Sequence, residues 1–218
     1  MEETTNEILE PTNFSDQDIF TKIWTSPRKI FKYINETNYE KYFYLLLFLA
    51  GVSRGFDRAS TKNMGDNLPL LTIVGFSIVL GGLLGWISFY LYAALVSWTG
   101  NWLKAEGDTK SIFRILTYGM LPSIIGTFLL IPQIAVYGNE LFKSEGDITS
   151  AGLIPNLVVY SCMFLEFALA IWTIILCVIG ISEVQKLSIG KSIINALLPV
   201  IVILVPIALI MLLITGIR

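Results

Sequence analysis

The sequence predicts an all-α membrane protein: a five-helix transmembrane bundle with an N-terminal amphipathic interfacial helix. Four apolar stretches each exceed the roughly 20 residues that carry a helix across a ~30 Å hydrocarbon core, and a shorter one precedes them. The 218 residues are 54% hydrophobic and only 15% charged, with a mean hydropathy of +0.68. A soluble domain typically has more charged residues and fewer hydrophobic residues than this. The unbroken Leu, Ile, Val and Phe runs also lack the alternation of membrane β-strands.

Three regions follow one another along the chain. Residues 1–15 are predicted to form a disordered acidic tail, because they are polar and rich in Glu. Residues 16–37 form a cytoplasmic amphipathic helical segment, and residues 38–218 form the five-span transmembrane domain. The apolar runs of that domain begin at Tyr42 and then cover residues 68–98, 112–137, 152–182 and 193–217.

The segment 16–37 carries its apolar residues on one helical face. They recur at i, i+1 and i+4 both before and after Ser26-Pro27, a pair typical of a helix start. Two interpretations stay open: a helix in the membrane interface with its cations toward anionic lipid headgroups, or a helix packed on the cytoplasmic ends of the spans. The candidate membrane-interface contacts are Phe20, Trp24, Arg28, Lys29, Phe31 and Lys32.

Small residues form a ridge on the second span. Ser77, Gly81 and Gly85 are spaced by four, so they lie along one side of a helix and let a neighbouring helix approach closely. We interpret them as candidate helix-packing positions. Packing within the chain is favoured over a dimer interface, because such ridges are common inside membrane bundles.

Ionisable residues at membrane depth form the candidate intramembrane polar site, which comprises Arg54, Asp57, Arg58 and Glu166. Glu166 lies sixteen residues before Ser182, about 24 Å along a helix, and Arg54 lies at a similar depth. An unpaired charge there costs several kcal/mol. We therefore hypothesise that Glu166 pairs with Arg54 or Arg58. A pair that fixes helix register is favoured over a proton or substrate relay.

Composition also bears on orientation and chemistry. The tail and two of the loops hold ten of the fifteen Lys and Arg residues, which predicts a cytoplasmic N-terminus and an outside C-terminus. The chain has no His, and its two Cys fall within one span, so we expect no metal, cofactor or catalytic site. No basic tract suits nucleic acid.

Several short motifs carry a family resemblance when they are taken together. They are the Ile-Trp-Thr-Ser-Pro element at 23–27, the segment 51–66, the Trp-Thr-Gly-Asn-Trp element at 98–102, Tyr-Gly-Met-Leu-Pro at 118–122, and residues 172–191. This set resembles the bacterial branch of the Yip-one (Ypt/Rab-interacting) membrane protein family. The resemblance implies five transmembrane helices and a cytoplasmic N-terminus. The eukaryotic members of the family are non-enzymatic membrane adaptors in vesicle traffic, whereas the role of the bacterial branch is largely undefined. The eukaryotic "D-L-Y-G-P" segment is absent, so Rab binding is not carried over.

Two functions remain open. The favoured one is a non-enzymatic integral membrane protein of the bacterial inner membrane that organises membrane or partner proteins. Its expected partners are the lipid bilayer, anionic lipid headgroups, and other proteins or further copies of this chain. The alternative is a small transporter or channel that uses an intramembrane Glu/Arg pair. A membrane-embedded enzyme would need clustered acid, base or metal groups, and the sequence offers one mid-span carboxylate.

Overall fold

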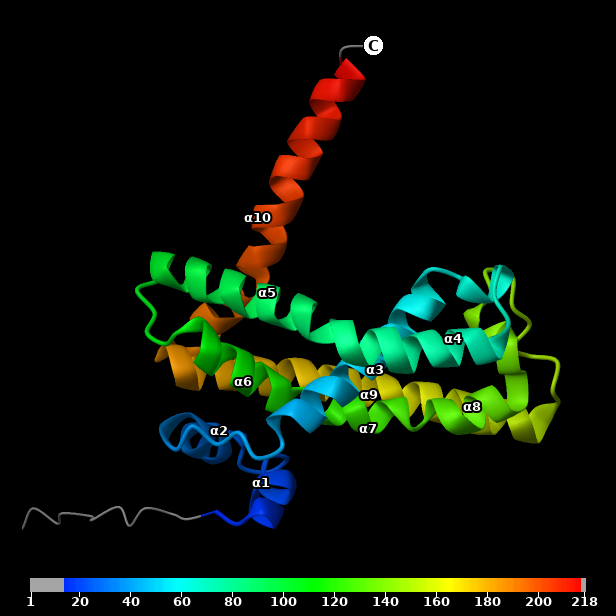
Figure 1. The fold of residues 1–218 in the computed structure, drawn as a ribbon, viewed down its shortest axis with the longest axis horizontal. Helices are drawn as coiled ribbons and strands as arrows, with labels where there is room; N and C mark the ends of the chain where they lie inside the picture. Colours follow the sequence, from blue (N-terminus) through cyan, green and yellow to red (C-terminus); the bar gives the residue numbers. More distant parts are fainter. Residues whose placement is uncertain (1–13, 217–218) are drawn as a thin grey trace, which may run out of the picture.

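Helices make up most of the computed structural model, which describes residues 14–216 (Figure 1). In chain order the elements are α1 (Asp16–Lys22), α2 (Pro27–Glu36), α3 (Phe43–Thr61), the 3₁₀ turn η1 (Met64–Asp66), α4 (Leu70–Phe76), the π-helical η2 (Ser77–Gly81), α5 (Gly82–Trp102), α6 (Thr109–Gly119), α7 (Leu121–Thr127), α8 (Leu130–Tyr137), the 3₁₀ turn η3 (Gly138–Phe142), α9 (Leu153–Gln185) and α10 (Ile189–Gly216). The predicted acidic tail lies outside the described residues, apart from Phe14 and Ser15.

Four helical stretches of the described residues are long and apolar enough to cross a membrane. They are Leu70–Trp102, Leu121–Phe142, Leu153–Gln185 and Ile189–Leu213. Helix α3 is 19 residues long, which corresponds to about 28 Å. It falls outside this group because three charged residues, Arg54, Asp57 and Arg58, interrupt its apolar sequence.

The third predicted run is divided into α6, α7 and α8. Pro122 lies in the first turn of α7, where a missing backbone N–H is tolerated. The preceding helix ends at Gly119, and Met120 N–H still donates to the carbonyl of Leu116 at 3.1 Å. The boundary between α6 and α7 therefore follows from proline chemistry inside one apolar run.

The bundle is built around α9 and α3. Helix α9 contacts α2, α6, α7, α8 and α10, while α3 contacts α5, α6 and α7. Figure 1 shows α5, the α6–α8 segment and α9 running roughly alongside one another, with α1 and α2 packed at one side. The main core cluster draws its buried side chains from α1, α2, α3, α5, α6, α7 and α9.

Small residues bring α3 and the α4–η2–α5 segment into backbone contact. A Cβ at Gly51 would lie 2.3 Å from the Gly81 carbonyl oxygen, and one at Gly85 would lie 2.4 Å from Gly51 Cα. A Cβ at Gly55 would lie 2.6 Å from the Ser77 carbonyl oxygen. The ridge of Ser77, Gly81 and Gly85 thus lies against another helix of the same chain.

Helix α10 leaves the bundle at an angle (Figure 1). Its first turns contact α5 and α9, and a buried polar network holds them there. Asn195 donates to Val96 O at 3.0 Å and to Gln185 Oε1 at 2.6 Å, and it accepts from Thr99 Oγ1 at 2.7 Å. Beyond Pro199 most of the described side chains of α10 are exposed.

Candidate functional site

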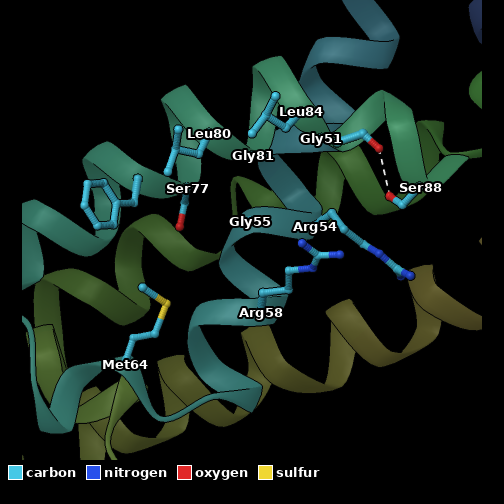
Figure 2. A pocket seen from close by; sticks show the side chains of 12 residues that line it. Gly51, Arg54, Gly55, Arg58, Met64, Ser77, Leu80, Gly81, Leu84 and Ser88 are labelled. Carbon is cyan, nitrogen blue, oxygen red and sulfur yellow. Dashed lines mark hydrogen bonds between the residues drawn. The ribbon is translucent and has the colours of Figure 1, made fainter.

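The four residues of the predicted polar site line two separate cavities. Arg54 and Arg58 line a cavity of about 300 Å³ between α3 and the η2–α5 segment. Figure 2 shows these two arginines on α3, with Ser77, Leu80 and Leu84 among the residues opposite. Asp57 lies on a different side of α3 and lines a second cavity, of about 360 Å³, together with Glu166. The fold thus separates the predicted arginines from the mid-span glutamate.

Glu166 binds a side chain that the sequence reasoning overlooked. Gln133 of α8 is 2% exposed. It donates one hydrogen bond to Glu166 Oε1 at 2.6 Å and another to Leu129 O at 3.0 Å. Within residues 14–216, no ion pair joins Glu166 to an arginine, so the structure lacks the hypothesised pair with Arg54 or Arg58. The sequence does offer one indication of this contact: Gln133 is a polar residue, directly after Pro132, within an apolar run.

The second cavity gathers oxygen atoms at its wall. Its lining includes the hydroxyl-bearing Ser53, Ser123 and Thr127 besides the two carboxylates. Such oxygen atoms can accept protons or coordinate hard cations, whereas zinc and copper prefer nitrogen and sulfur ligands. In the described part of the chain, no group of three or more His, Cys, Asp or Glu residues has the arrangement to hold a metal ion.

The α1–α2 pair is attached to the bundle by buried apolar side chains and by polar contacts of Asp16 at the start of α1. Ile19, Ile30 and Ile34 are fully buried in the main core cluster. The Asp16 carboxylate accepts hydrogen bonds from Tyr39 Oη at 2.7 Å and Tyr42 Oη at 3.0 Å, and it also pairs with Lys41. Hydrogen bonds from Lys41 and then Tyr39 lower the pKa of Asp16 to about 2.

One of the candidate membrane-interface contacts lies inside the protein. Phe31 is fully buried, with its ring near Gly180 of α9, so its assignment to the interface is corrected. Phe20 and Trp24 are half-buried and pack against the core. Helix α2 packs on α9 and α6, and this contact buries its apolar face.

The cations of α2 remain on the surface. Arg28, Lys29 and Lys32 are exposed. Arg28 and Lys29 border a groove of about 810 Å³ whose other wall consists of Ile and Val side chains from α9 and α10, among them Ile175 and Ile193. A cationic rim above an apolar wall is suited to an amphiphile with a negative charge.

A buried arginine lies near the start of α3. Arg114 of α6 is 2% exposed, and it donates to Glu40 Oε1 from Nη2 at 2.7 Å and from Nε at 3.2 Å. Lys110 reaches the same oxygen at 3.4 Å. The Arg114 hydrogen bonds hold the pKa of Glu40 below its ordinary value. Lys110 and Arg114 are among the ten cations that predict a cytoplasmic N-terminus, and nothing in the sequence pattern indicates that they meet at Glu40.

Apolar helices of membrane-spanning length, with a few polar side chains gathered in small cavities, define the class of integral membrane proteins. A family model for the Yip1 domain matches residues 21–210. The chain therefore belongs to the Yip1 domain family, and the expected family resemblance is confirmed. No curated protein and no solved structure matches the chain. The family is not known as enzymatic.

Proposed function

We propose that this protein is a non-enzymatic, five-span protein of the bacterial inner membrane, with a cytoplasmic N-terminus and an outside C-terminus. Through its α1–α2 face it organises membrane or partner proteins. The observation that carries the proposal is the docking of α1 and α2. Their apolar residues are buried in the bundle while Arg28, Lys29 and Lys32 stay exposed beside an apolar groove. A fixed cationic surface of this kind recruits anionic lipid or an acidic amphipathic segment.

Contacts at the far end of the bundle support α3 as the fifth span. Asn139 of η3 donates to Gly65 O at 2.9 Å and to Leu68 O at 3.2 Å. Ser144 N–H donates to Asp66 Oδ1 at 3.1 Å. The connector that follows α3 thus lies beside the loop that follows α8. Helix α3 therefore extends from the level of the α1–α2 pair to the loops at the α8 end of the bundle.

Site-specific photocrosslinking tests this function. A photoreactive amino acid in place of Lys29 is expected to give covalent adducts with anionic lipid or with a defined protein partner in intact membranes. Its matched control replaces Lys62, an exposed lysine after α3 that lies away from the groove. Equal adducts at both positions would contradict the proposal, because contacts would then be independent of the α1–α2 face.

The transporter alternative makes a different prediction. If the cavity shared by Asp57 and Glu166 served permeation, proteoliposomes would show solute or proton flux, and Glu166→Gln would abolish it. We expect no such flux. Flux that disappears in Glu166→Gln, with helical content unchanged by circular dichroism, would replace the adaptor role with transport.

A further inference from the structure

The junction of α3, α5 and α6 holds a pocket of about 460 Å³ with a charged end and an apolar wall. Glu40, Lys110 and Arg114 form the charged end, and the aromatic side chains Tyr44, Trp86 and Tyr90 contribute to the wall. The adaptor role proposed above uses neither this pocket nor its arginine. An amphiphilic lining of this kind matches a ligand with one charged and one apolar part.

The charges that line this end of the pocket do not balance one another. Lys110 and Arg114 both contact the same Glu40 oxygen, so two cations share one carboxylate and leave a net charge of +1. Arg114 Nη1 is buried and has no hydrogen-bond partner among the described residues. A buried donor without an acceptor is costly. Phosphate oxygens are the acceptors that a guanidinium binds best, through paired hydrogen bonds.

The aromatic wall indicates the depth of the pocket in a membrane. Tyr44, Trp86 and Tyr90 are 76%, 45% and 47% exposed. Tyr and Trp gather where the hydrocarbon meets the headgroups, since their rings are apolar and their polar tips need water or phosphate. Farther along α5, Leu83 and Ile87 are exposed and extend the apolar surface. The charged end of the pocket therefore lies at headgroup level.

We propose that this pocket binds the phosphate of an anionic phospholipid, with Lys110 and Arg114 holding the phosphate and the acyl chains lying along Tyr44 and Trp86. The inference rests on the proposed membrane insertion. The net positive charge favours an anionic headgroup over a zwitterionic one, because the amine of the latter would be repelled. Phosphatidylglycerol is the probe lipid that matches this chemistry.

Fluorescence quenching by brominated lipids tests the pocket in the full chain in nanodiscs. The signal from Trp86 is the difference between the unmodified chain and Trp86→Phe. Brominated phosphatidylglycerol is expected to quench this signal more strongly than brominated phosphatidylcholine at the same mole fraction. Lys110→Gln should lower that preference about fivefold, which is the size expected for the loss of one solvent-exposed charge contact. Lys110 is exposed, so its loss leaves folding intact.

The control variant is Lys191→Gln, which removes an exposed lysine outside the pocket and should leave the preference unchanged. Equal quenching by both lipids, or equal losses in the two lysine variants, would overturn the proposal. So would millimolar inorganic phosphate that abolishes the lipid preference, since the site would then serve a soluble anion. Carbonate extraction measures membrane insertion independently of lipid binding. A chain that stays inserted without a lipid preference refutes this site alone, whereas an extractable chain refutes the membrane function itself.

Discussion

A single carboxylate can link segments that are distant in the sequence. Asp16 joins the start of α1 to Tyr39, Lys41 and Tyr42, which lie just before α3. Ser15 and Asp18 form a capping box at the same helix start, so two carboxylates stabilise one short helix. The attachment of α1 therefore depends on the ionised state of these carboxylates.

The pKa of Asp16 predicts an acid-sensitive attachment. Its pKa is lowered from 3.8 to about 2 in the folded chain, so the ionised form is favoured by folding. This stabilisation is complete above about pH 4 and is lost as the pH falls toward 2. The protection of α1 amides, taken as their exchange rate relative to the intrinsic rate at each pH, should fall through that window. Asp16→Asn should show faster exchange at pH 6 and a weaker pH dependence.

The control for that measurement is Asp66→Asn, since Asp66 lies after α3 and away from α1. It should leave exchange in α1 unchanged. If Asp16→Asn retained the full acid sensitivity of the unmodified chain, the attachment would have to depend on another group. Asp18 is the first candidate, because its pKa is lowered to about 2 by hydrogen bonds from Lys22 and Ser15.

Glu166 shows where residue-level reasoning from sequence fails. Depth along a helix was estimated well enough to bring Glu166 and the α3 charges into one part of the molecule. The rotation of α3 about its own axis could not be estimated in this way. In the structure, that rotation places Arg54 and Arg58 at one cavity and Asp57 at the other. The hydrogen-bond partner of Glu166 is Gln133. Gln133 lies on α8, and the position of α8 depends on the break between α7 and α8.

At the scale of elements, the α3–α5 contact depends on glycine because backbone meets backbone. Gly51→Ala would bring a Cβ to 2.3 Å from the Gly81 carbonyl oxygen, which neither helix can relieve by rotating a side chain. We expect a loss of about 1–3 kcal/mol in the free energy of unfolding, measured by titration with a denaturing detergent.

Gly75→Ala is the matched control, because a Cβ at Gly75 meets nothing within 4 Å. It should be neutral or slightly stabilising, since Ala favours a helix by up to ~1 kcal/mol over Gly. Equal effects of the two substitutions would show that helix propensity, rather than the close approach of α3 and α5, sets the stability of this contact.

For the whole molecule, the proposed topology predicts which loops face each side of the membrane. Single cysteines in place of Glu36 and Glu106 should react with an impermeant thiol reagent only from the cytoplasmic side. Cysteines in place of Asn67 and Glu145 should react only from the outside. All four positions are exposed. The Asn67 position decides whether α3 spans, because it lies in the connector between α3 and the next candidate span.

Cys162 and Cys177 lie within α9, so both are first replaced by alanine to remove background labelling. Circular dichroism of this cysteine-free chain checks that its helical content is retained. Should the Asn67 position react from the same side as Glu36, the chain would have four spans and α3 would belong to the cytoplasmic face. Reversed labelling at all four positions would invert the orientation but keep five spans.

Composition and apolar run length alone determined that this chain is an all-helical integral membrane protein, because a lipid-exposed backbone must satisfy its hydrogen bonds within each helix. The set of short motifs was sufficient to predict the family to which the chain belongs. Periodicity also located the apolar face of the N-terminal segment, although it left open whether lipid or protein would cover that face.

Tertiary structure decided what each face meets. The bundle covers Phe31, Gln133 takes the place of an arginine beside Glu166, and Glu40 gathers Lys110 and Arg114 into one pocket. These outcomes depend on helix rotation and on contacts between residues more than 30 positions apart. Hydrophobicity is non-directional, so it places a helix in the membrane without choosing its neighbours.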